Sequence, residues 1–187
     1  MRVLIGLLFV TIGCEGARTE KVSPEVSVDE YTMLKESDRL WTYRDDGVPL
    51  GSPSNAVLIR GRNAGDGVLD LRRGSRWADG EREGQIAFSQ TDRIRVVEWE
   101  LGDSSGQGNY PLAKSTTQEG DEVSEGDWSC TVERPNLVET YYGDFSDVVT
   151  FACSGSDGPV GDWHFAKNVG LVAFDGAAYQ LDLVAPW

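Results

Sequence analysis

The chain has 187 residues, of which 40% are apolar and 10% aromatic, a composition typical of a globular protein and not of a disordered one. Its 31 Asp and Glu residues outnumber 17 Lys and Arg residues, which gives a formal net charge of -14. Because such a surface is repelled by phosphate backbones and by anionic lipid, we expect no nucleic-acid partner and no electrostatic docking on a membrane.

The first thirteen residues have the features of a secretory signal peptide. Arg2 supplies one positive charge, and the apolar run over residues 3–12 is too short to span a bilayer. The following Gly13-Cys14 resembles the lipobox of bacterial lipoproteins, although Thr11 stands where that pattern prefers Leu. The resemblance implies cleavage and acylation at Cys14. The alternative is an ordinary secretory signal cut nearby, with Cys14 removed or left as a free thiol.

The pattern predicts three segments: a signal peptide (1–13), a lipidated N-terminus and tether (14–30), and a β domain (31–187). The tether is polar and shows no period of 2 or 3.6. A domain of this size buries roughly 70% of its unfolded surface, so it needs neither a metal nor a disulfide to fold. A short helix and a continuing coil both fit residues 29–37.

From Tyr31 onward, short apolar runs alternate with turn residues, which is typical of an all-β chain. We expect one antiparallel, strongly curved sheet or incomplete barrel. The apolar positions change phase at Val96-Val97, which predicts a β-bulge there. Asp175-Gly176 predicts a hairpin turn. Residues 102–126 are rich in Gly, Ser, Thr and acidic side chains, so we expect a long mobile loop there.

The three cysteines are best explained together. Acylation of Cys14 leaves Cys130 and Cys153, each placed on the apolar face of an expected strand. In an oxidising compartment these two can pair, so we predict a Cys130–Cys153 disulfide. The alternative is two buried free thiols that act as small apolar residues.

No catalytic residue is predicted. The single histidine, His164, lies on the strand face opposite Trp163 and Phe165, and no nucleophile-elbow motif is present. Glu98 and Glu100 are the other candidates.

These two carboxylates flank Trp99 and resemble the acid-plus-aromatic sets of sugar-binding or sugar-cleaving sites, but a solvated strand face opposite Arg93 and Arg95 is the simpler explanation. No metal-ligand spacing and no phosphate-binding loop is found, so we expect no metal and no cofactor.

Tryptophan is the remaining candidate for ligand binding. Most of the six tryptophans fall in strand-like runs, where a core position is the simplest explanation. If four of them stand on the open face of a curved sheet, they would line an apolar groove; these are Trp41, Trp99, Trp128 and Trp163.

Three stretches resemble a group of bacterial lipoproteins of unassigned function. The first is an aromatic, a Leu-Lys pair and a Trp-Thr-Tyr strand, matched here by Tyr31, residues 34–35 and residues 41–43. The second is Gly-x-Phe-x-Asp-Val at residues 143–148, and the third resembles residues 165–172, where Asn168 replaces the usual Gly. The resemblance implies a β-rich fold and export, and it implies no catalytic residue.

We therefore expect a membrane-anchored lipoprotein of the bacterial envelope, in the outer membrane and facing the periplasm or the surface. Its role is expected to be structural or binding and not enzymatic. The expected partners are the membrane, through the lipid anchor, and an envelope protein or an apolar ligand. The alternatives are a half-barrel lipid carrier or assembly factor, and a glycan hydrolase.

Overall fold

The computed structural model describes residues 23–33, 40–44, 58–63, 67–73, 81–90, 92–101, 104–177 and 179–186. The predicted signal peptide and Cys14 lie outside these residues. The first elements are β1 (Val26–Ser27), α1 (Asp29–Thr32), β2 (Leu40–Arg44), β3 (Leu58–Asn63), β4 (Val68–Arg73), β5 (Glu81–Gln90), β6 (Arg93–Leu101) and β7 (Ser104–Lys114). They are followed by β8 (Thr116–Thr117), β9 (Glu122–Glu125), β10 (Trp128–Glu133), β11 (Val138–Glu139), β12 (Asp144–Phe145), β13 (Val148–Ser154), β14 (Gly161–Ala166), β15 (Gly170–Gly176) and β16 (Gln180–Pro186).

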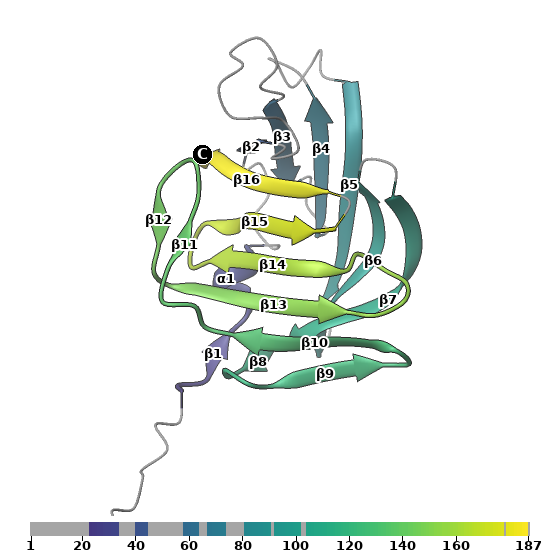
Figure 1. The fold of residues 1–187 in the computed structure, drawn as a ribbon, viewed down its shortest axis with the longest axis vertical. Coiled ribbons are helices and arrows are strands. Elements are labelled where there is room, and N and C mark those ends of the chain that lie inside the picture. Colours follow the sequence, from purple (N-terminus) through teal and green to yellow (C-terminus); the bar gives the residue numbers. More distant parts are fainter. Residues whose placement is uncertain are drawn as a thin grey trace, which may run out of the picture.

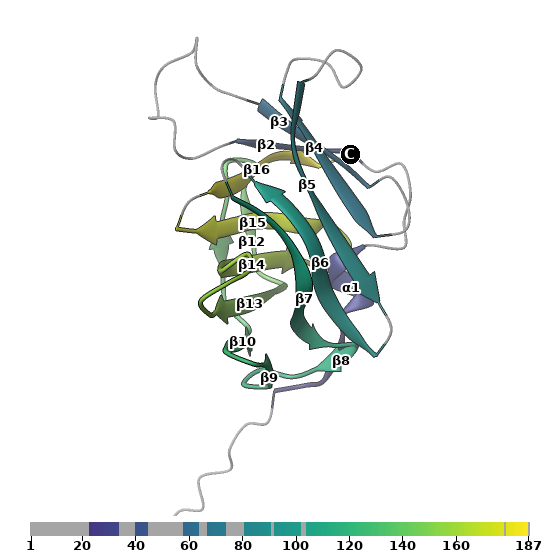
Figure 2. The ribbon, with the colours of Figure 1, turned by 90° about the vertical axis from the view of Figure 1, so that its right-hand side faces the viewer.

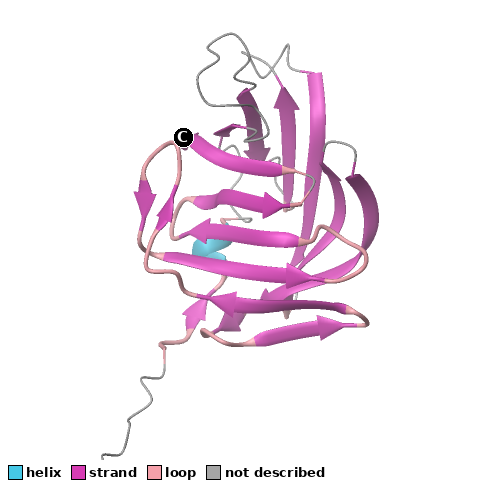
Figure 3. Ribbon diagram, viewed as in Figure 1, coloured by secondary structure: helices cyan, strands magenta, loops and turns pink. Residues whose placement is uncertain are grey.

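The strands form two facing layers. Hydrogen-bonded neighbours follow the order β7-β6-β5-β4-β3-β2-β16-β15-β14-β13-β10-β9, while β1 pairs with β8 and β11 pairs with β12. Figures 1 and 2 show β3 to β7 in one layer and β9, β10 and β13 to β16 in the other. Strands dominate the described chain, and α1 is a single short helix (Figure 3).

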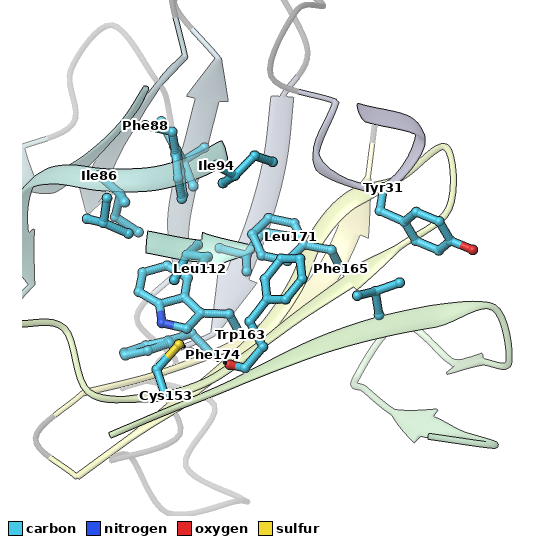
Figure 4. Packing of buried hydrophobic residues seen from close by; sticks show 14 of the residues in the cluster. Tyr31, Ile86, Phe88, Ile94, Leu112, Cys153, Trp163, Phe165, Leu171 and Phe174 are labelled. Carbon is cyan, nitrogen blue, oxygen red and sulfur yellow. Dashed lines mark hydrogen bonds between the residues drawn. The ribbon is translucent and has the colours of Figure 1, made fainter. Parts of the chain in front are cut away.

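The all-β, antiparallel prediction is confirmed, but the predicted strong curvature is not found. No sheet among the described residues is closed or strongly curled. The reason lies in the centre of the molecule, where side chains of both layers meet (Figure 4). The ring of Phe88 on β5 lies 6.0 Å from that of Trp163 and 6.4 Å from that of Phe165, both on β14. These edge-to-face contacts hold the layers face to face, so aromatic side chains fill the space that a lumen would occupy.

A second group of aromatic side chains joins the two layers at β7 and β10. Tyr110 on β7 lies between Trp99 and Trp128, with ring centroids 5.1 and 5.0 Å away. The indole nitrogen of Trp128 on β10 also donates to the carbonyl oxygen of Pro111 on β7 at 2.9 Å. The edge strand β7 is therefore attached to the opposite layer by side chains and not by a strand ladder.

The predicted bulge on β6 is confirmed. Ala87 pairs with Glu98 and Phe88 with Val96, so Val97 is the extra residue. Ile94, Val96 and Trp99 are consequently all buried, although the alternation changes phase between them. The hairpin predicted at Asp175-Gly176 is also present, between β15 and β16.

The prediction of a long mobile loop over residues 102–126 is wrong. Most of this segment is strand, in β7, β8 and β9. Two of its glycines serve packing: a Cβ atom at Gly106 would collide with the ring of Trp99, and one at Gly108 with the ring of Tyr110. Glycine composition indicated a loop, whereas these glycines make room for aromatic rings.

The folded domain also begins earlier than predicted. β1 and α1 include residues 26–30, which the sequence placed in the tether. Val26 pairs with Thr117 of β8, and the backbone N–H of Val28 donates to the carbonyl oxygen of Ser115 at 3.0 Å. The end of the predicted tether is thus part of the domain.

The predicted disulfide between Cys130 and Cys153 is confirmed. The two cysteines are direct cross-strand partners on β10 and β13, and both are buried in the core. The bond therefore links neighbouring strands of one layer.

Replacing both cysteines by alanine (Cys130→Ala/Cys153→Ala) should lower the free energy of unfolding by about 3 kcal/mol, because the bond closes a loop of roughly 20 residues in the unfolded chain. Urea denaturation of the purified protein measures this. The matched control is Ser129→Ala/Ser154→Ala, the next pair on the same ladder, which should shift the midpoint little. A midpoint unaffected by reduction or by the double cysteine variant would contradict the prediction.

Candidate functional site

The most exposed apolar side chains lie on one hairpin. Within the described part of the chain, the exposed large apolar residues are Leu137 (47% exposed), Tyr141 (53%) and Tyr142 (56%). All three belong to the β11–β12 hairpin and the residue that precedes it. Exposed aromatic residues gathered on one element are typical of an interaction surface.

The tip of this hairpin is a two-residue turn. Thr140 and Gly143 exchange backbone hydrogen bonds of 3.0 and 3.1 Å, so Tyr141 and Tyr142 occupy the two central positions. Gly143 has φ +151°, a conformation that favours glycine. Tyr141 and Tyr142 are not among the described non-glycine residues with positive φ, so the turn has no left-handed central position that would favour Asn or Gly, and it accommodates tyrosines.

The backbone of the tip is attached to β16. The N–H of Tyr142 donates to the carbonyl oxygen of Leu183 at 2.8 Å, and the N–H of Tyr141 lies 3.2 Å from both carboxylate oxygens of Asp182. The ring of Tyr142 stacks on that of Phe145, with centroids 6.2 Å apart and an interplanar angle of 21°. The hairpin therefore presents its tyrosines from a fixed backbone.

Exposed carboxylates lie on both strands of the hairpin. Glu139 and Asp144 are direct cross-strand partners in the β11–β12 ladder, and both are exposed. Like charges placed directly opposite each other destabilise a ladder. Residues 133–147 contain four carboxylates and a single cation, Arg134.

That single cation is engaged at the base of the hairpin. The guanidinium of Arg134 donates to Asp147 at 3.1 Å and to the phenolic oxygen of Tyr31 at 3.2 Å, and it lies 5.5 Å from the centroid of the Tyr31 ring. The hydroxyl of Tyr31 in turn donates to Asp147 at 2.7 Å. Arg134 precedes β11 and Asp147 follows β12, so the N-terminal segment holds both ends of the hairpin together.

Two neighbouring contacts strengthen the attachment of the N-terminal segment. The backbone N–H of Asn168 donates to the carbonyl oxygen of Glu30 at 2.8 Å, and Lys167 forms a 2.9 Å ion pair with the Glu30 carboxylate. The hydrogen bond to Glu30 raises the pKa of Lys167. Asn168 has φ +60°. Asn tolerates this left-handed conformation, so the turn is kept.

An apolar cavity lies between the two layers. It has about 280 Å³ of empty space, part of it open to solvent, and is lined by Thr32, Trp41, Tyr43, Leu69, Phe88, Phe165 and Leu171. The hydroxyl of Tyr43 donates to the carbonyl oxygen of Leu171 at 2.9 Å, and burial raises the pKa of Tyr43 well above its usual value. The hydroxyl of Thr32, a residue only 3% exposed, has no hydrogen-bond partner among the described residues.

The four tryptophans predicted to line a groove are all buried. Trp41 borders the cavity, and its indole nitrogen donates to the carbonyl oxygen of Val169 at 2.8 Å. Trp99 and Trp128 pack against Tyr110, and Trp163 lies at the centre of the core, 4.3 Å from the ring of Phe174. The structure therefore brings these residues into the packing of the two layers and not onto one open surface.

His164 joins three strands of one layer. Its Nδ1 lies 2.8 Å from the hydroxyl of Thr150 on β13, and its Nε2 lies 3.2 Å from the carboxylate of Asp175 on β15. This arrangement has the residue types of a nucleophilic triad. However, Thr150 is only 2% exposed, so its hydroxyl is closed to a substrate. The contacts are best explained as a link between strands.

The carboxylates of Glu98 and Glu100 lie on the strand face opposite the buried Trp99, and both residues are half-buried. A sugar site would need the Trp99 ring on the same face as the two carboxylates, and the structure places it on the other face. In the part of the chain that the structure describes, no three His, Cys, Asp or Glu side chains gather in a way that would hold a metal ion.

The described residues also include no helix with the length and apolar character needed to cross a bilayer. No protein-family model, curated protein or solved structure matches this chain.

Tyr141 and Tyr142 are not among the residues predicted from the sequence. The pattern that could have indicated an exposed turn there is a Tyr-Tyr pair that precedes a glycine and lies between two short apolar runs.

Replacing Tyr31 by phenylalanine should lower the free energy of unfolding at pH 7 by about 1 kcal/mol, because the hydrogen bond to Asp147 is lost. Burial and, next, that hydrogen bond raise the pKa of Tyr31 from 10.0 to about 12. The folded protein thus holds the phenolic proton more tightly than the unfolded chain, and the resulting stability is complete below pH 10 and lost as the pH rises through about 12. Urea denaturation from pH 7 to pH 12 should therefore show a smaller alkaline loss in Tyr31→Phe than in the native protein. An equal loss would contradict this assignment.

Proposed function

We propose that the protein is an exported lipoprotein of the bacterial envelope that is anchored through Cys14 and acts by binding, without catalysis. In this proposal the β11–β12 hairpin is the binding face. The observation that carries it is the placement of the two ends of the domain. In Figures 1 and 2, residues 23–27 lie at one end of the molecule, and the tip of the hairpin lies towards the other, beside β16.

The N-terminal segment is attached at the end that contains β8 and β9. Val26 pairs with Thr117 of β8, and the hydroxyl of Ser23 donates to Glu119 at 2.6 Å. Residues 14–25 would reach up to roughly 40 Å when extended, at about 3.3 Å per residue. An acylated Cys14 would thus keep the β8–β9 end within roughly 40 Å of the membrane, and the tyrosine tip lies towards the other end of the domain from this attachment.

The chemistry of the cysteines supports export. A disulfide between Cys130 and Cys153 is consistent with an oxidising compartment outside the cytoplasm. Acylation of Cys14 would then account for the odd cysteine. The resemblance of residues 143–148 and 165–172 to a lipoprotein group favours the same assignment, with the outer membrane as the expected location.

The anchor is tested by expressing the full chain in a bacterial host with an alkyne-labelled fatty acid. The native protein should be labelled and should sediment with membranes, whereas Cys14→Ser should be unlabelled and released. The matched control, Cys130→Ala/Cys153→Ala, removes the other two cysteines and should keep the label. An unlabelled native protein, or a Cys14→Ser variant that remains acylated, would overturn the anchor.

The cavity supports a second candidate function, that of an apolar-ligand carrier. Its walls are apolar, and the buried Thr32 hydroxyl could bind one polar group of a ligand. The volume inside it that water molecules can occupy is only about 10 Å³, far below the roughly 300–1,000 Å³ typical of ligand pockets, which is why this function comes second.

A carrier should release an apolar molecule on extraction after native purification from membranes. Leu69→Trp, which fills the cavity, should reduce the molecule found by mass spectrometry at least about tenfold. Leu137→Trp, on the exposed hairpin, is the matched control and should leave its amount unchanged. Ligand-free native protein would argue against a carrier.

A further inference from the structure

We infer that the tip of the β11–β12 hairpin docks an arginine-bearing segment of a protein partner. This inference rests on the proposed function, in which the hairpin is the binding face. It adds the chemistry of the partner.

The tip offers the two kinds of group that a guanidinium binds. Tyr141 and Tyr142 are each more than half exposed, and an aromatic face attracts a cation placed over it. Glu139 and Asp144 come directly before and after the turn pair Thr140 and Gly143, and they lie on the strand face opposite Phe145, on which the Tyr142 ring stacks. An arginine-bearing segment can stack one guanidinium on a tyrosine and place another on the carboxylates, and an ammonium does both less well.

The charge of the hairpin is not balanced from within. Arg134, the one cation of residues 133–147, is bound at the base by Asp147 and Tyr31. Glu139 and Asp144 face each other across the ladder, where their repulsion destabilises the hairpin. A cationic partner would relieve this repulsion, so charge complementarity favours arginine over an acidic or neutral partner.

The backbone of the hairpin tip is held in place before any partner binds. It is already attached to β16 through Leu183 and Asp182, and the ring of Tyr142 already stacks on Phe145. A surface organised before binding loses less conformational entropy when the partner arrives.

The test uses the full-length protein in detergent and two fluorescein-labelled peptides of equal length and charge, one of alternating Arg and Gly and one of alternating Lys and Gly. We expect the Arg peptide to bind more tightly than the Lys peptide. Tyr141→Ser/Tyr142→Ser and, separately, Glu139→Gln/Asp144→Asn should each weaken binding of the Arg peptide by about tenfold or more.

The matched control is Glu122→Gln/Asp157→Asn, which removes the same charge from exposed positions on β9 and the β13–β14 connection. It should change binding much less than the hairpin variants. Circular dichroism and an intact Cys130–Cys153 bond establish that each variant is folded. Equal binding of the two peptides, or an equal loss in the control, would overturn the inference.

A photo-crosslinking residue at position 142, in place of Tyr142, separates this inference from the proposed function. In native membranes, a crosslink to a protein segment that contains arginine supports both. A crosslink to an acidic or arginine-free segment or to a glycan, with no preference for the Arg peptide, overturns the arginine partner and leaves a binding role in place. No crosslink from the anchored protein, together with no peptide binding, overturns both.

Discussion

The contact of Phe88 with Trp163 and Phe165 is the interaction on which the remaining structure depends. The strand ladder passes from one layer to the other only where β2 pairs with β16 in the described order, so hydrogen bonds alone would allow the layers to separate. The three aromatic rings prevent this at the centre of the molecule. The group around Tyr110 does so at the far side. The layer that carries the hairpin is consequently supported from behind by packed aromatic side chains.

The N-terminal segment contacts the base of the hairpin. Tyr31 belongs to α1, yet its hydroxyl and ring contact Asp147 and Arg134, the residues that bound the hairpin on either side. The position of the base of the hairpin is thereby linked to α1 and to the N-terminal segment that precedes it.

Local patterns predicted the features that depend on neighbours in sequence. Alternation placed Trp163 and Phe165 in the core, the phase change identified the bulge at Val97, and strand spacing indicated the cysteine pair. The arrangement of the layers could not be predicted in this way, because it is determined by which rings meet across a long sequence separation. The same limit explains the error at Gly106, where the ring that requires a glycine belongs to another strand.

The backbone of the hairpin tip does not select for tyrosine. Neither Tyr141 nor Tyr142 has a positive φ, so most residue types would suit the two central positions and would leave the bonds between Thr140 and Gly143 unchanged. The attachments to β16 come from backbone N–H groups, so they do not require tyrosine at 141 or 142. Stacking on Phe145 accounts for part of the Tyr142 ring, and more than half of each tyrosine is still exposed. Folding therefore does not require two exposed aromatic rings on an acidic hairpin, whereas recognition of a cationic partner would use both kinds of group.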